Sequence, residues 1–155
     1  PCGLGARDSL RLEAGLNLYG TDMNSDTSPY ISNLAWTVCL KDNSRDFVGK
    51  TALEQELARG PQQQLTGVIM TTPGVLRCQQ PVMSNGEIVG TITSGGFAPT
   101  LNHAIGMARL PISPPADLYI DRRGKPVPIQ IHPLPFIQAG SATKTQGDTN
   151  ANTMP

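Results

Sequence analysis

The stretch LTGVIMTTPGVLRCQQPVMSNGEIVGTIT, residues 65–93, decides the fold. Its first six residues are mainly apolar and β-branched, which is typical of a strand, and Thr72-Pro73-Gly74 follows as a turn. Asn85-Gly86 strongly favours a two-residue β-hairpin, and it precedes a second β-branched run at 87–93. This part of the chain therefore predicts antiparallel strands joined by tight turns.

The same pattern of short apolar runs separated by turns continues toward the C-terminus. Residues 104–110 form a further apolar stretch, and the runs 117–120 and 127–131 flank a polar hairpin turn at 121–125. At least five short strands without a helix between them indicate a small antiparallel barrel or sandwich. Residues 94–100 carry the glycines of a phosphate loop but no lysine, so we interpret them as a tight turn leaving a strand.

Two helices are expected before the strands. Ser9 is placed to cap a short first helix that Gly15 ends, and residues 51–59 have the leucine spacing of a second helix, stopped by Gly60-Pro61. Between them, residues 34–40 are apolar and β-branched, and we interpret them as an extended or mixed segment. The chain is therefore expected to be mostly β with short helices.

Composition excludes some partners. The 155 residues hold 12 basic and 12 acidic side chains, so no net field attracts nucleic acid or an anionic membrane, and neither is expected as a partner. No apolar run approaches the length of a spanning helix. The three cysteines, Cys2, Cys39 and Cys78, are widely spaced and form no CxxC motif, which favours free thiols over a metal site.

Five segments, in order, resemble the glycine cleavage T-protein family over about residues 3–137. They are GLGARDSLRLEAGLNLYG at 3–20, DFVGK with the following Ala-Leu at 46–53, GVLR with Pro-Val at 74–82, GTITSGGFAPTL at 90–101, and GKPVP with PFI between 124 and 137. A chance match of five ordered segments is negligible. The resemblance implies a small antiparallel Greek-key β-barrel, preceded by the end of an α+β folate-binding domain.

The resemblance also implies a division of the chain. Residues 1–33 are expected to end the central folate-binding domain, and 34–62 to form a connecting segment with a helix. Residues 63–137 are expected to form the C-terminal barrel. From 138 to 155 the chain is rich in Ser, Thr, Gly, Asn and Gln, which predicts a disordered tail.

The function implied by the resemblance is that of an aminomethyltransferase. Such an enzyme moves the methylene of an aminomethyl group, carried by the lipoylated H-protein, to tetrahydrofolate, and releases ammonia. Tetrahydrofolate is the co-substrate, no metal is implied, and the compartment is the bacterial cytoplasm or, in a eukaryote, the mitochondrial matrix. The alternative is a non-catalytic folate-binding or interaction barrel, as in dimethylglycine or sarcosine oxidising enzymes or an iron–sulfur assembly protein.

Site residues follow from the matched motifs. The arginine of the GARD element, Arg7, is expected to bind folate, because a guanidinium meets carboxylates bidentately. Arg11 and Arg77 are expected to have structural or secondary roles, with Arg77 bracing the barrel against a neighbouring domain. Asp8 and Glu13 are interpreted as a cap or ion-pair partner. No residue matches the family's catalytic aspartate, which lies in the first domain, so this chain alone is expected to be inactive.

Overall fold

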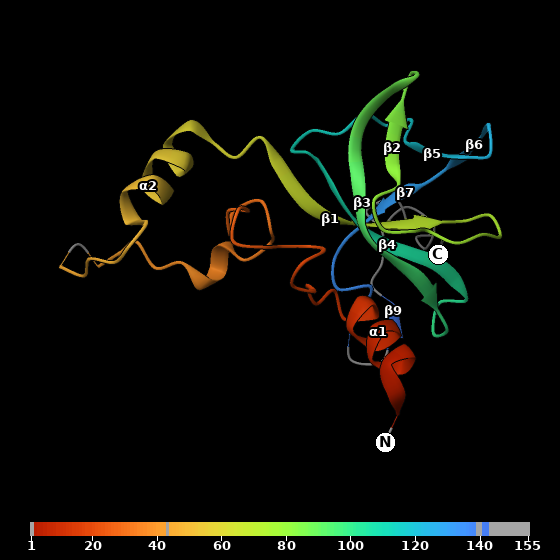
Figure 1. The fold of residues 1–155 in the computed structure, drawn as a ribbon, viewed down its shortest axis with the longest axis horizontal. Helices are drawn as coiled ribbons and strands as arrows, with labels where there is room; N and C mark the ends of the chain where they lie inside the picture. Colours follow the sequence, from red (N-terminus) through yellow and green to blue (C-terminus); the bar gives the residue numbers. More distant parts are fainter. Residues whose placement is uncertain (1, 43, 139–140, 143–155) are drawn as a thin grey trace, which may run out of the picture.

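The computed structural model describes residues 2–42, 44–138 and 141–142. Two α-helices and a short 3₁₀ helix, η1, precede a series of strands (Figure 1). The elements are α1 (Gly3–Glu13), η1 (Ala35–Thr37), α2 (Lys50–Arg59), β1 (Gln63–Met70), β2 (Pro81–Ser84), β3 (Glu87–Ala98), β4 (His103–Pro111), β5 (Tyr119–Arg122), β6 (Lys125–Pro128), β7 (Gln130–His132), β8 (Ile137–Gln138) and β9 (Ser141–Ala142).

Within the described residues, seven strands form one antiparallel sheet in the order β6-β5-β2-β3-β4-β1-β7. Strands β2, β3 and β4 follow one another as hairpins, and β5 returns to pair with β2. That arrangement is a Greek key. The two edge strands, β6 and β7, are separated by Ile129 alone, so the chain itself brings the two edges together. The expected Greek-key barrel is therefore confirmed.

Turn chemistry sets the two hairpins. Asn85 and Gly86 have φ values of 50° and 85°, and Arg123 and Gly124 have 56° and 78°. Two consecutive residues with positive φ form the turn whose twist matches paired strands. The hairpins predicted at 85–86 and within 121–125 are thus both present, and they fix the register of β2 with β3 and of β5 with β6.

The core has two parts, and β4 contributes to both because successive side chains point to opposite faces of a strand. One part is formed by buried side chains inside the curled sheet. The other lies under α1, where Leu12 of the helix packs with Ile105 and Met107 of β4 and with Phe136. The first cluster comprises Val68, Met70, Leu76, Val82, Ile92, Ala104, Ala108, Leu110, Leu118, Ile120 and Ile129.

Helix α1 differs from the prediction at its start and agrees at its end. It begins at Gly3, and Ser9 donates a hydrogen bond to the Gly5 carbonyl within the helix instead of capping it. Gly15 has a φ of 65°, and the Leu16 amide donates to the Arg11 carbonyl at 2.8 Å. This C-terminal cap needs a left-handed residue, which the glycine supplies at little cost.

One local expectation is met in part and another requires correction. Residues 35–37 form η1 and Val38 is extended, so the segment expected to be extended or mixed is mixed; the Trp36 side chain is 82% exposed. Residues 94–98 continue β3 instead of turning. A Cβ at Gly95 would lie 2.4 Å from the Leu76 carbonyl oxygen, so the glycine permits a close backbone approach.

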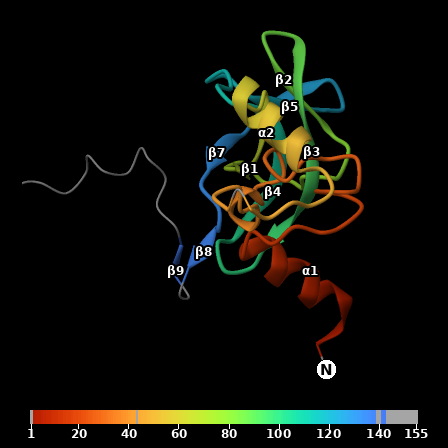
Figure 2. The ribbon, with the colours of Figure 1, turned by 90° about the vertical axis from the view of Figure 1, so that its left-hand side faces the viewer.

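Helix α2 agrees with the predicted 51–59 helix within one residue and ends at Gly60. It stands apart from the sheet in Figure 1, and in Figure 2, which looks from that side, it lies in front of the strands. None of its residues is buried. Of the expected tail, Gln138 lies in β8 and pairs with Ser141 of β9, which differs from a disordered tail at those positions. Residues 139–140 and 143–155 lie outside the described part of the chain.

Helix α1 lies against β3 and β4 at one end of the sheet (Figure 1). In the described ranges, no helix is long and apolar enough to cross a membrane.

Candidate functional site

The arginines that the sequence singles out occupy two separate regions. Arg7 and Arg11 lie one turn apart on α1, whereas Arg77 lies in the connection between β1 and β2. The described residues include no contact that links Arg77 to the two helical arginines. The structure therefore gives the pair on α1 and Arg77 separate surroundings.

Arg11 turns toward the barrel. Its Nη1 donates to Oδ2 of Asp22 at 2.8 Å, and its Nη2 donates to Oγ of Ser94 at 3.0 Å. The Arg11 side chain is only 14% exposed, and that of Asp22 is fully buried. A buried charge needs a close partner of opposite charge, so this pair ties α1 to β3 through the loop that carries Asp22. These contacts support the structural role proposed for Arg11.

The Asp22 carboxylate receives four hydrogen bonds. Besides Arg11, it accepts from the Leu18 amide at 2.8 Å, from Oγ1 of Thr93 at 2.6 Å and from Oγ of Ser94 at 2.8 Å. Four donors match the acceptor capacity of an ionised carboxylate. Asp22 therefore joins the helix, its own loop and β3 at one buried point.

Glu13 forms a second attachment of α1. Its two carboxylate oxygens accept hydrogen bonds from the Thr100 amide at 3.0 Å and from Oγ1 of Thr100 at 2.9 Å. Glu13 is 5% exposed, so this contact is shielded from water. The side chain therefore binds the turn between β3 and β4, and it is neither a helix cap nor an ion-pair partner among the described residues.

Arg7 takes no part in these attachments. Its side chain is 55% exposed, and its nearest carboxylate is that of Asp8, with Nη1 and Oδ1 4.0 Å apart. Asp8 also lies 3.4 Å from Nε of Arg11, which agrees with its expected role as an ion-pair partner. An exposed pair of this kind contributes little to stability. The Arg7 guanidinium is therefore available to an anionic ligand. It lies on the helix that Arg11 and Glu13 attach to the barrel.

Arg77 is exposed and borders a cavity of about 310 Å³ together with Arg122 and Arg123. Its backbone amide donates to Oε1 of Gln80 at 3.3 Å. One carboxylate, that of Asp121, lines the same cavity. This surface is cationic, which suits contact with an acidic neighbour.

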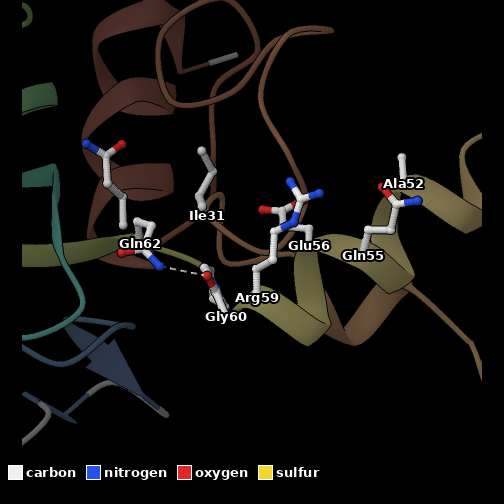
Figure 3. A pocket seen from close by; sticks show the side chains of 9 residues that line it. Ile31, Ala52, Gln55, Glu56, Arg59, Gly60 and Gln62 are labelled. Atoms are coloured by element: carbon white, nitrogen blue, oxygen red, sulfur yellow. Dashed lines mark hydrogen bonds between the residues drawn. The ribbon is translucent and has the colours of Figure 1, made fainter.

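A larger cavity of about 550 Å³ lies between Ile31 and the C-terminal half of α2 (Figure 3). Glutamine amides, Glu56 and Arg59 line it, and Gln62 donates to the Gly60 carbonyl at 3.0 Å across its edge. None of the three arginines predicted from the sequence borders this cavity. It is therefore separate from the site on α1.

Sequence reasoning misses Asp22, Thr93 and Ser94. Asp22 is one of several polar residues in an expected loop, and Ser94 falls in the segment interpreted as a turn. Their contacts join positions 71 and 72 residues apart, and only the fold brings them together. No group of three or more His, Cys, Asp or Glu that could hold a metal occurs in the described ranges.

Two family models match the chain. Residues 63–138 match the glycine cleavage T-protein C-terminal barrel domain, and residues 1–42 match the GCVT N-terminal domain. The first match begins where β1 begins, and it includes every strand of the seven-stranded sheet in the described chain. The second includes α1 with Arg7 and Arg11, and the loop with Asp22.

Two curated relatives that match the chain share the same name. An aminomethyltransferase of Xanthomonas campestris pv. campestris (strain 8004) is 51% identical over 142 residues, which are 92% of this chain and 38% of the relative. An aminomethyltransferase of Xylella fastidiosa (strain M12) is 48% identical over 141 residues, 90% of this chain and 38% of the relative. The chain thus spans well under half the length of these relatives.

A solved structure agrees with both comparisons. The glycine cleavage system aminomethyltransferase T from Bartonella henselae superposes with a TM-score of 0.81 at 35% identity, over 87% of this chain and 39% of that one. Family models, relatives and fold all point the same way, so the chain belongs to the glycine cleavage T-protein family and contains its C-terminal barrel domain.

Proposed function

We propose that this chain supplies α1 and the C-terminal barrel of a tetrahydrofolate-dependent aminomethyltransferase. The reaction moves the methylene of an aminomethyl group on the lipoyl arm of the H-protein to N5 and N10 of tetrahydrofolate, which gives 5,10-methylenetetrahydrofolate. The lipoyl arm is left in its dihydrolipoyl form, and ammonia is released. The observation that carries the proposal is the 51% identity to a relative named Aminomethyltransferase over 92% of this chain.

Arg7 is the proposed folate contact. Folate ends in carboxylates, and a guanidinium offers a planar fork of donors that matches them. The Arg7 side chain is 55% exposed and has only a distant carboxylate neighbour. Arg11 and Glu13 attach α1 to the barrel, so the backbone of Arg7 is held in place and only its exposed side chain has to become ordered when it meets its ligand.

The remaining catalytic groups are proposed to come from the rest of a longer protein. The transfer needs a carboxylate near N5 and the departing ammonia, and no residue of this chain matches the family's aspartate. This fits a chain that spans 38% of the length of its relatives. Residues 1–33 would then complete the central folate-binding domain, and residues 34–62 would connect it to the barrel.

The proposed partners are tetrahydrofolate and the lipoylated H-protein. The proposed compartment is the bacterial cytoplasm, as for an enzyme with bacterial relatives.

Arg77 is proposed to brace the barrel against a neighbouring domain. Its exposure and the cationic surface that it shares with Arg122 and Arg123 support this role. The names of the relatives favour aminomethyl transfer over a non-catalytic barrel of a folate-linked oxidising enzyme.

A chimera tests the proposal. This chain replaces the matching 142 residues of the Xanthomonas campestris relative, and tetrahydrofolate-dependent release of ammonia from the aminomethylated H-protein is measured. The proposal predicts turnover within about tenfold of the unmodified relative. A chimera with the thermal stability of the relative but without turnover would contradict it.

A further inference from the structure

Arg109 is a second arginine that approaches Asp22. Among the described residues, Arg109 forms no ion pair with a carboxylate. Nη2 of Arg109, on β4, donates to the backbone carbonyl oxygen of Asp22 at 2.6 Å. The four donors already described occupy the carboxylate of Asp22, and one of them is Arg11. The Asp22 charge is already balanced by Arg11, and Arg109 forms no ion pair with a carboxylate in the described residues.

The Arg109 guanidinium is held in a half-buried position. Its Nε is buried and has no hydrogen-bond partner in the described structure. Burial lowers the pKa of Arg109, while the charge of Asp22 acts in the opposite direction. A guanidinium remains protonated in proteins, so this burial means that a positive charge lies in surroundings that solvate it poorly. Half-buried charges of this kind are normally paired.

Arg109 borders a cavity of about 310 Å³ between the loop that begins at Gly20 and the outer surface of the sheet. The other polar side chains of the lining are the hydroxyls of four threonines and the amides of one asparagine and two glutamines. No carboxylate side chain belongs to the lining. Hydroxyls and amides can donate to an anion, and neither type repels it.

The floor of the cavity contains a glycine that the sheet requires. A Cβ on Gly90 would lie 2.4 Å from the carbonyl oxygen of Arg109 and 2.5 Å from Cδ2 of the buried Leu110, so the glycine is required by close packing toward the core, and its backbone borders the cavity. Thr91 lies directly opposite Arg109 in the register of β3 with β4, so both side chains emerge on the same face. The arginine is thus flanked in the cavity by a short threonine.

We propose that this cavity binds a small oxyanion, a carboxylate or a phosphate, with Arg109 as the residue that recognises its charge. Thr91 and the amides of Asn24, Gln63 and Gln79 supply further donors, since the hydroxyls of Thr21, Thr27 and Thr93 already donate within the protein. The site is separate from the proposed folate contact at Arg7, because none of the cavity's lining residues belongs to α1. Binding here does not depend on aminomethyl transfer.

The test uses the 155-residue chain labelled with nitrogen-15, and records amide chemical shifts at low ionic strength. Acetate, succinate and inorganic phosphate are titrated separately, with chloride as the reference anion. Saturable shifts are expected at Gly20, Thr21, Gly90 and Thr91. Saturation by acetate or succinate assigns the site to carboxylates, and saturation by phosphate alone assigns it to phosphates.

Arg109→Gln is expected to weaken this binding about tenfold or more, and Arg109→Lys to weaken it less, because lysine keeps the charge without the fork. Arg45→Gln, which removes an exposed arginine outside the cavity, is the matched control and should bind as the parent chain does. Shifts that follow the chloride reference, or that are equal in Arg109→Gln, would overturn the proposal.

A second pair of variants covers the case in which Arg109→Gln does not fold. Thr91→Glu places a carboxylate opposite Arg109, so it should raise the melting temperature relative to the neutral Thr91→Gln and abolish oxyanion binding. Thr91→Gln should still bind. If Thr91→Glu bound oxyanions as well as Thr91→Gln does, Arg109 would not be the recognition residue.

Discussion

Arg11 and Asp22 form an ion pair with Nη1 and Oδ2 2.8 Å apart, and the carboxylate is fully buried. The pair joins α1 to a loop that also binds β3 through Thr93 and Ser94. Arg7, four residues earlier, remains largely exposed. Arg11 thus holds the helix in place, whereas Arg7 faces solvent. The effect of each arginine on stability can be measured.

Removal of Arg11 should destabilise the chain. Arg11→Gln would leave a buried carboxylate without its cation, and breaking a buried pair from one side costs on the order of 3 kcal/mol. Arg7→Gln should change the free energy of unfolding by less than about 0.5 kcal/mol, because its ion pair is exposed. Urea denaturation of the two variants measures both values, and equal losses would contradict the assignment.

At two glycines with different backbone conformations, substitution by alanine should change stability in opposite directions. Gly86 has a φ of 85°, so Gly86→Ala strains the hairpin turn and should cost about 1 kcal/mol. Gly5 lies within α1 at an ordinary φ, and a Cβ added there would meet nothing within 4 Å, so Gly5→Ala should stabilise by about 0.5–1 kcal/mol. Thermal unfolding followed by circular dichroism measures whether each substitution raises or lowers stability.

The Ser84–Asp117 contact should make stability depend on pH in the acid range. Oγ of Ser84 donates to Oδ1 of Asp117 at 2.7 Å, and this hydrogen bond is the main cause of a lowered pKa at Asp117. Since the folded pKa lies below the unfolded value of about 3.9, the contribution is present above that pH. It is lost as the pH falls through the lower, folded pKa.

Ser84→Ala should therefore raise the pKa of Asp117 toward its ordinary range. Carbon-13 NMR titration of the side-chain carboxyl of Asp117 measures the shift directly. Asp42, whose pKa is lowered mainly by a hydrogen bond from the Ser44 hydroxyl, lies outside both hairpins and serves as an internal control that should not change. An unchanged Asp117 titration in Ser84→Ala would show that the hydroxyl does not set its pKa.

The sequence predicts the elements that local chemistry determines. Asn85-Gly86 specifies a turn by its own conformational preference, and α2 ends where Gly60 interrupts the helical pattern. The turn predicted for 94–100 is wrong over 94–98, which continue β3, because Gly95 is required by a close approach to Leu76, a contact across the fold. The segment 34–40, expected to be extended or mixed, is mixed, since strand propensity needs a neighbouring strand to hold a segment extended throughout.

The candidate site is predictable only in part. Arg7 is found through the matched GARD element and Arg11 through its place one helical turn later, and the structure gives them different surroundings. The partner of Arg11 cannot be found in this way, because Asp22 lies in a polar loop with Asn24, Ser25 and Asp26, which have the same local signal. Burial, which only the fold reveals, distinguishes Asp22 from these neighbours.

The most direct test of the proposed folate contact is the KM for tetrahydrofolate of the chimera that carries Arg7→Ala. We expect KM to rise about tenfold or more, because a charge-assisted contact to a folate carboxylate is lost, while thermal stability is unchanged. Arg45→Ala, another exposed arginine, is the control and should leave KM unchanged. A KM for Arg7→Ala equal to that of the control would contradict the assignment of Arg7 to folate.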